Sequence, residues 1–174
     1  MAIQREELVK LAEFIDTTFK RYRWEWSINC GGCGVFALAV SDRLKRLGIK
    51  HRFMAMTHVY NDVTPPKWGH KFYQPSIREF NNDGDLGISH CVVEMIGYKK
   101  PVVIDSTGYL NDRLADLMDD YDAIKTYMSR PLLEKLVRDR RSWNPEFDRR
   151  RVPAIKKKLD RAFNEWGEMY GIAL

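Results

Sequence analysis

Apolar residues recur at steps of three and four over two long stretches of the chain. Residues 6 to about 22 carry one such stripe, with charged residues between its members: Leu8, Leu11, Ile15, Phe19 and Tyr22. The end of the chain repeats the spacing at Val152, Ile155, Leu159, Phe163, Trp166 and Tyr170. A stripe of this period lies on one face of an amphipathic helix. These stretches, with a shorter one at 132–137, predict helices packed on a core.

A glycine-rich turn, Gly31-Gly32-Cys33-Gly34, leads into a different pattern. The apolar run 35–40 continues through Leu44 and Leu47 and is closed by Gly48. An apolar run of this length that ends at a glycine predicts a buried helix with a glycine C-cap. Cys33 would then lie in the first turn, where unpaired N–H groups and the helix dipole stabilise a thiolate.

Three segments have the composition of strands. Residues 51–60, 88–96 and 102–105 are rich in β-branched, aromatic or other apolar residues, and Gly97-Tyr98-Lys99-Lys100-Pro101 separates the last two as a turn. The stretch 61–89 contains repeated Pro, Gly and Asn residues and predicts a long loop. From residue 111 the spacing of five apolar residues predicts another helix: Leu114, Leu117, Met118, Tyr121 and Ile124.

Composition predicts one soluble domain over residues 1–174, with a core at about 28–110 and a C-terminal helical part at about 111–174. The hydrophobic content of 44% and charged content of 30% are ordinary for a globular protein. No apolar run is long enough for a membrane span, and the N-terminus lacks a signal-peptide core. Three cysteines without an export signal fit reduced thiols, so we expect a cytoplasmic protein that does not bind membranes.

The net charge of +5 is unevenly distributed. Residues 130–161 contain 12 Lys/Arg and 5 Asp/Glu, a local charge of +7 that leaves −2 for the rest. Two interpretations are open. The basic residues form a solvated helical face, or they form a surface for nucleic acid or another polyanion.

The strand pattern brings a histidine and an aspartate together. Residues paired across an antiparallel hairpin have numbers with a constant sum, which is 195 for a two-residue loop and 197 for a four-residue loop. Both registers place His90 and Asp105 on one face, as direct or diagonal neighbours, whereas an odd loop would separate them. The opposite face is then apolar: Cys91, Val93, Met95, Val102 and Ile104. Asp105 can orient His90, whose second nitrogen is left to take the proton of Cys33.

At these positions the chain resembles a known superfamily. The segment 31–37, with alanine four residues after Cys33, is similar to the cysteine-helix motif of transglutaminase-like proteins. Leu47-Gly48-Ile49 matches the helix end of that family, and Asp105-Ser106-Thr107 matches its Asp-x-Thr strand end. Residues 30–33 also resemble the cysteine-protease motif. The resemblance covers 30–108 and implies an α+β fold with a papain-like (transglutaminase-like) core, in which a nucleophile-bearing helix packs on an antiparallel sheet, with additional C-terminal helices.

We therefore predict a cysteine peptidase or amidase with a Cys33-His90-Asp105 triad, a thioester intermediate and no cofactor. Its substrate would be a peptide, a protein or a small amide. One alternative is an acyltransferase or transglutaminase that uses an amine acceptor. Another is a non-catalytic binding protein that uses the basic C-terminal helices.

Further site residues are predicted around this triad. The papain-type oxyanion glutamine would correspond to Ser27, so Asn29 and the Cys33 backbone N–H are the candidate oxyanion donors. Four other side chains could contact substrate: Trp26, Trp68, His70 and Tyr73.

The spacing of Cys30 and Cys33 leaves two other uses open. The pair could bind zinc with His90 or Cys91, although structural zinc sites usually use two such pairs. It could also form a thioredoxin-like redox pair, although no βαβ pattern surrounds it. We therefore predict no metal site, and a packing or secondary role for Cys30.

Overall fold

The computed structural model describes residues 3–59, 86–120, 124–139 and 147–172. In chain order it contains α1 (Arg5–Phe19), α2 (Tyr22–Glu25), the π-helical turn η1 (Ile28–Gly32), α3 (Cys33–Arg46), β1 (His51–Val59), β2 (Leu86–Met95), β3 (Val102–Asp105), β4 (Gly108–Tyr109), α4 (Leu114–Asp120), β5 (Ile124–Met128), α5 (Arg130–Arg138), the 3₁₀ turn η4 (Arg149–Arg151) and α6 (Val152–Tyr170).

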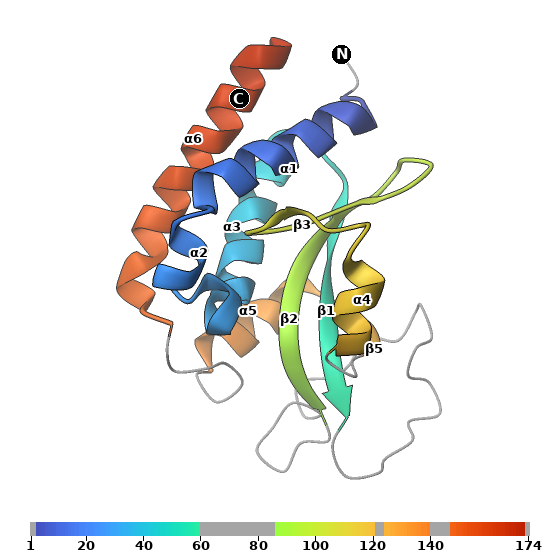
Figure 1. The fold of residues 1–174 in the computed structure, drawn as a ribbon, viewed down its shortest axis with the longest axis vertical. Coiled ribbons are helices and arrows are strands. Elements are labelled where there is room, and N and C mark those ends of the chain that lie inside the picture. The colour runs from blue at the N-terminus through green and yellow to red at the C-terminus, as the bar shows by residue number, and fades with distance from the viewer. Residues whose placement is uncertain (1–2, 60–85, 121–123, 140–146, 173–174) are drawn as a thin grey trace.

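The strands form one five-stranded antiparallel sheet in the order β4-β3-β2-β1-β5. Helices α1, α3 and α6 lie on one side of the sheet and α4 on the other (Figure 1). The architecture is therefore mixed α+β. In the β2–β3 hairpin Val93 pairs with Ile104, which is the second of the two predicted registers, with a sum of 197.

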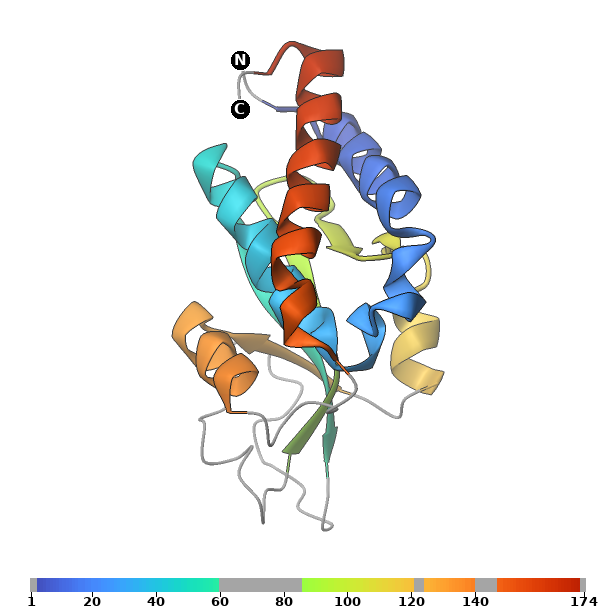
Figure 2. The same ribbon diagram turned by 90° about the vertical axis from the view of Figure 1, so that its left-hand side faces the viewer.

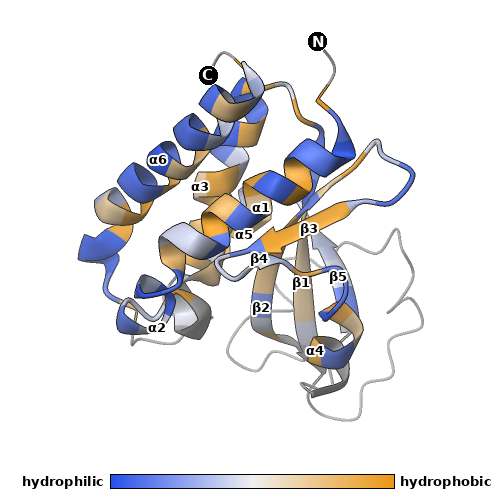
Figure 3. Cartoon of the chain, turned by 45° about the horizontal axis from the view of Figure 1, so that its top comes forward, coloured by the Kyte–Doolittle hydropathy of each residue, from blue (hydrophilic) through white to orange (hydrophobic). Residues whose placement is uncertain are grey.

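The main core lies between the sheet and the helices α1, α3 and α6. Four of the five predicted stripe residues lie in α1 and are fully buried, as are the central members of the α6 stripe. The fifth, Tyr22, begins α2 and is half-buried. Figure 3 shows the resulting alternation of hydrophobic and hydrophilic segments along both helices. The indole Nε1 of Trp166 donates to the carbonyl of Glu7 over 2.6 Å and ties α6 to α1. Among the described helices, none combines the length and apolar character that crossing a membrane requires.

A smaller cluster covers the opposite face of the sheet. Its buried members come from three strands and the segment after β4: Met54, Met56, Val92, Val103 and Leu110. Leu114 and Leu117 of α4 pack against this cluster. Because successive strand residues point to opposite faces, the residues of β2 and β3 divide between the two clusters as the hairpin register predicts.

The prediction of a helix that reaches Ile124 was wrong. Helix α4 ends at Asp120, and Ile124 begins β5, where it pairs with Thr57 of β1. Thr126 and Met128 are buried while Lys125 and Tyr127 are half-buried, so this segment has the period of a strand. The chain after residue 111 therefore supplies an edge strand to the sheet as well as helices.

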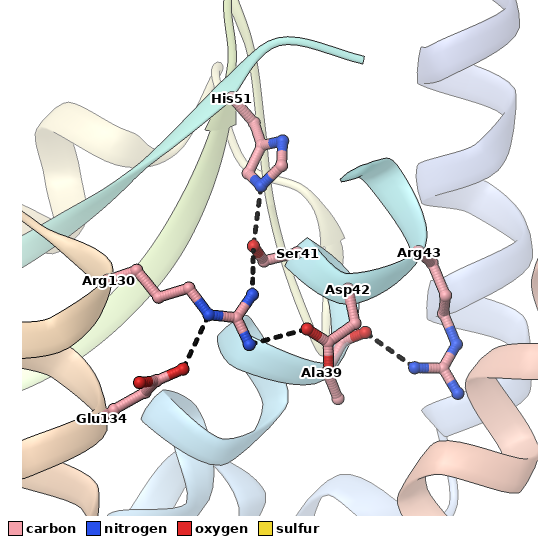
Figure 4. A network of polar contacts seen from close by, with 7 residues as sticks. All are labelled: Ala39, Ser41, Asp42, Arg43, His51, Arg130 and Glu134. Atoms are coloured by element: carbon pink, nitrogen blue, oxygen red, sulfur yellow. Dashed lines mark hydrogen bonds and ion pairs between the residues drawn. The ribbon is translucent and has the colours of Figure 1, made fainter. Parts of the chain in front are cut away.

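A polar network joins α3, α5 and β1 on the side away from α1 (Figure 4). The guanidinium of Arg130 donates to Asp42 and to Glu134 over 2.7 Å each. Ser41 accepts a longer bond of 3.4 Å from the same guanidinium and contacts Nε2 of His51 at 2.7 Å. These contacts give His51 a structural role and fix α5 against α3.

Candidate active site

Cys33 is the first residue of α3 and its side chain is only 3% exposed. The turn before it needs two of its glycines for different reasons. Gly31 has φ = 103°, a left-handed conformation that glycine adopts without strain. Gly32 has no such φ, but a Cβ there would lie 2.5 Å from the ring of Phe147. The glycine-rich motif thus allows the turn to pack closely against Phe147, and α3 begins at Cys33.

His90 lies on β2, at the level where β3 has just ended, and is 7% exposed. Its Nε2 is 2.7 Å from Oδ2 of Asp105, the last residue of β3. The two residues are diagonal neighbours on one face of the hairpin, as the register requires.

Asp105 is held by hydrogen bonds at both carboxylate oxygens. Oδ1 accepts from the backbone N–H and from the hydroxyl of Thr107, both at 2.6 Å, and Oδ2 faces His90. Burial alone would raise the pKa of Asp105, but the bonds from His90 and Thr107 outweigh it and lower the pKa. Arg113 in turn donates to the Thr107 hydroxyl over 3.1 Å.

The second partner of His90 is Cys33. Because Asp105 takes Nε2, Nδ1 is the ring nitrogen left for the sulfur. Burial alone would lower the pKa of His90, but its hydrogen bonds to Asp105 and Cys33 and their negative charges raise it from 6.5 to about 10. At neutral pH the imidazole is therefore protonated, between a carboxylate and a sulfur atom.

Cys91 follows His90 in the strand and points to the opposite face, into the main core. Cys91 is 1% exposed, which agrees with the prediction that this face of the strand is apolar. Burial, and to a smaller degree the charge of Cys33, raise the pKa of Cys91 well above its usual range. Its thiol stays neutral and unreactive.

Of the other predicted site residues, the structure describes the side chain of Trp26 alone. Trp26 is a core residue that packs on Tyr22 with a ring separation of 4.6 Å. Asn29 belongs to η1, but its side chain, like that of Cys30, lies outside what the structure describes. Three further predicted contact residues also lie outside the described residues: Trp68, His70 and Tyr73. In the described part of the chain, no three His, Cys, Asp or Glu side chains gather as metal ligands would.

Sequence reasoning did not assign roles to two residues that support the site. Thr107 was part of the Asp-x-Thr motif, and an aspartate followed two residues later by threonine is a signal for a side-chain turn. Phe147 gave no comparable signal, because its contact with Gly32 joins segments more than a hundred residues apart.

The arrangement of Cys33, His90 and Asp105 can activate a thiol. The ring of His90 lies beside the sulfur at the first turn of α3, and the carboxylate of Asp105 fixes the orientation of the ring. The same ring, when protonated, can donate its proton to a leaving group.

Comparison of the chain with protein-family models, with curated proteins and with solved structures gives no match.

Proposed function

We propose that the protein is a thiol-dependent acyl-transfer enzyme, a cysteine peptidase or amidase in which Cys33 is the nucleophile. The observation that carries the proposal is the position of His90, whose Nε2 lies 2.7 Å from Asp105 and whose ring also has a hydrogen bond to Cys33. A nucleophile, a base and an orienting group in this order form the constellation of covalent catalysis.

The reaction begins with attack of the Cys33 thiolate on the carbonyl carbon of an amide or ester. A carbon–sulfur bond forms, and the carbonyl electron pair moves to the oxygen, which N–H groups at the start of α3 can stabilise. Collapse of this intermediate breaks the bond to the leaving group. His90 gives its proton to the departing nitrogen or oxygen, and a thioester remains on Cys33.

In the second half-reaction His90, now neutral, takes a proton from water as the oxygen attacks the thioester. The carbon–sulfur bond breaks, the acid product leaves, and the thiolate–imidazolium pair is restored. An amine in place of water would give an acyltransferase or a transglutaminase. The helix that carries Cys33 packs on the antiparallel sheet that carries His90 and Asp105, which supports a papain-like core for this chemistry.

Alkylation of the cysteines tests the proposal directly. Iodoacetamide should label Cys33 selectively below neutral pH, as located by mass spectrometry, because the imidazolium favours the reactive thiolate. The His90→Ala variant should lose about tenfold or more of this rate. His51→Ala removes a histidine from the neighbouring strand, outside the triad, and should leave the rate unchanged. Cys91 is an internal reference for a buried thiol.

Transfer of an acyl group is the second measurement. After incubation with p-nitrophenyl acetate, Cys33 should carry an acetyl group that hydroxylamine removes, and Cys33→Ala should carry none. If Cys33 is labelled no faster than Cys91 and is not acetylated, Cys33 is not an activated thiol and the proposal is wrong. A primary amine that accelerates release of the acetyl group would favour the transferase over the hydrolase.

A further inference from the structure

A groove lies between α3, α5 and the start of α6, on the side of α3 that does not face the sheet. The three helices are neighbours in space, with α3 in contact with both others (Figure 2). The groove encloses about 260 Å³. Its apolar floor is formed by Val35 and Leu38 of α3, Val137 of α5 and Val152 of α6. All of these side chains are aliphatic and partly exposed.

Cations surround this floor. Arg130, Arg149 and Lys156 line the groove, and Asp42 is the one acidic residue among those that line it. Figure 4 shows Arg130 held in place by Asp42 and Glu134. Arg149 donates to the carbonyls of Val137 and Arg138 at the end of α5. Two of the three cations are therefore fixed at the rim by neighbouring groups.

Lys156 is the cation of this groove whose charge is least neutralised by neighbouring groups. Its side chain is exposed, and it makes no ion pair with any described residue. The segment 149–158 around it contains six Lys/Arg and no acidic residue. Lys156 is consequently the rim charge that an anionic partner would neutralise.

We propose that this groove binds an acidic peptide segment that places an apolar side chain on the floor and carboxylates at the rim. The volume is just below the 300–1,000 Å³ typical of pockets for whole small ligands, and so suits one or two side chains of a longer chain. A single-stranded nucleic acid fits less well. Such ligands stack on aromatic rings, and the residues that line this groove include none.

A fluorescein-labelled peptide of glutamates around two leucines is the probe, measured by fluorescence anisotropy on the full chain. The same peptide with glutamine for glutamate tests the charge, and oligothymidylate tests a nucleic acid. Lys156→Glu reverses a rim charge and should weaken peptide binding about three- to tenfold. Leu38→Ala removes part of the floor and should also weaken it. Lys157→Glu is the matched control, an exposed neighbour with the same charge change that does not line the groove.

The proposal requires salt-sensitive, saturable binding of the glutamate peptide that Lys156→Glu and Leu38→Ala reduce and Lys157→Glu largely spares. Weaker binding of the glutamine peptide belongs to the same pattern. Three results would overturn the proposal: no saturable binding of the glutamate peptide, an equal effect of the two lysine variants, or tighter binding of oligothymidylate than of the glutamate peptide. Cys33→Ala should bind like the wild type, so this result does not depend on the catalytic proposal. If Leu38→Ala lowers the melting temperature, the comparison of the two lysine variants decides.

Discussion

Thr107 determines how Asp105 presents its carboxylate to His90. Its hydroxyl and its backbone N–H both bond to Oδ1, so Oδ2 alone remains for the imidazole. A carboxylate fixed in this way holds the histidine ring in one orientation and one protonation pattern. The hydroxyl is therefore a positioning group that acts on Cys33 through two other side chains.

Thr107→Val should slow alkylation of Cys33 at pH 6 by about tenfold, because the loss of a hydrogen bond to a charged group costs about 1.5–3 kcal/mol. Thr107→Ser retains the hydroxyl and is the matched control, with a rate near that of the wild type. The measurement is the rate constant for iodoacetamide labelling. Equal rates in the valine and serine variants would show that the hydroxyl does not act through Asp105.

The pair of His90 and Asp105 also makes stability depend on pH. The folded-state pKa of His90, about 10, lies above its unfolded value of 6.5, so its contribution is complete below 6.5 and is lost as the pH rises toward 10. The pKa of Asp105 is lowered below 3.8, so its contribution is present above that value and is lost in acid.

Urea unfolding at pH 6 and pH 10 measures this effect against His90→Gln. The free energy of unfolding of the wild type should fall more than that of the variant over this range, by about 2 kcal/mol. Titrating groups that do not contact His90 are common to both proteins and cancel in the comparison. Parallel pH profiles would mean that His90 is not protonated in the folded state at neutral pH.

The positions of Cys33, His90 and Asp105 in the fold could be predicted because each depends on local pattern. Cys33 follows from a glycine turn before an apolar run, and His90 and Asp105 share a face because the strand period is two. Phe147 and Arg113 could not be predicted in this way. Their contacts with Gly32 and Thr107 depend on how helices and turns pack in three dimensions, which no local period encodes.

At the scale of elements, the start of α3 depends on the C-terminal part of the chain. The turn η1 delivers Cys33 to the first position of the helix, and Phe147, just before η4, covers Gly32. Gly32 has φ = −97°, which any residue can adopt, so the ring of Phe147 is the main reason for a glycine at this position.

Gly32→Ala should destabilise the protein by about 1–3 kcal/mol, because the added methyl group overlaps the ring and forces a shift. It should also slow labelling of Cys33, whose position depends on this turn. Phe147→Leu should remove part of the penalty, so that the double-mutant cycle shows a coupling of at least about 0.5 kcal/mol. Additive effects in urea unfolding would indicate that the strain arises elsewhere in the turn.

The strand β5 shows where sequence patterns stop distinguishing elements. Apolar residues at 114, 117, 118 and 121 have a helical spacing, and Ile124 continues it. The segment 124–128 nevertheless pairs with β1. The sequence pattern did not indicate this strand, because five residues show too little alternation to stand out from the helical spacing before them. Pairing partners distant in sequence decided its structure.

On the scale of the whole molecule, one core cluster joins α1, α3, the sheet, α5 and α6. Leu159 of α6 and Cys91 of β2 both belong to it and are almost fully buried. Since the same cluster buries Cys33, the candidate site depends on helices that contribute none of Cys33, His90 and Asp105. Loss of α6 packing should therefore open the sheet rather than detach a separate unit.

Leu159→Ala tests this dependence in a Cys33→Ser background, where Cys91 reports on the core. The substitution should lower the free energy of unfolding by about 2–5 kcal/mol, the usual cost of removing a buried leucine side chain. In urea, alkylation of Cys91, identified by mass spectrometry, and the far-UV circular dichroism should have the same midpoint in each protein, because α6 and β2 unfold together. A Cys91 midpoint unchanged by Leu159→Ala, with part of the helical signal lost earlier, would instead divide the molecule into two independent folding units.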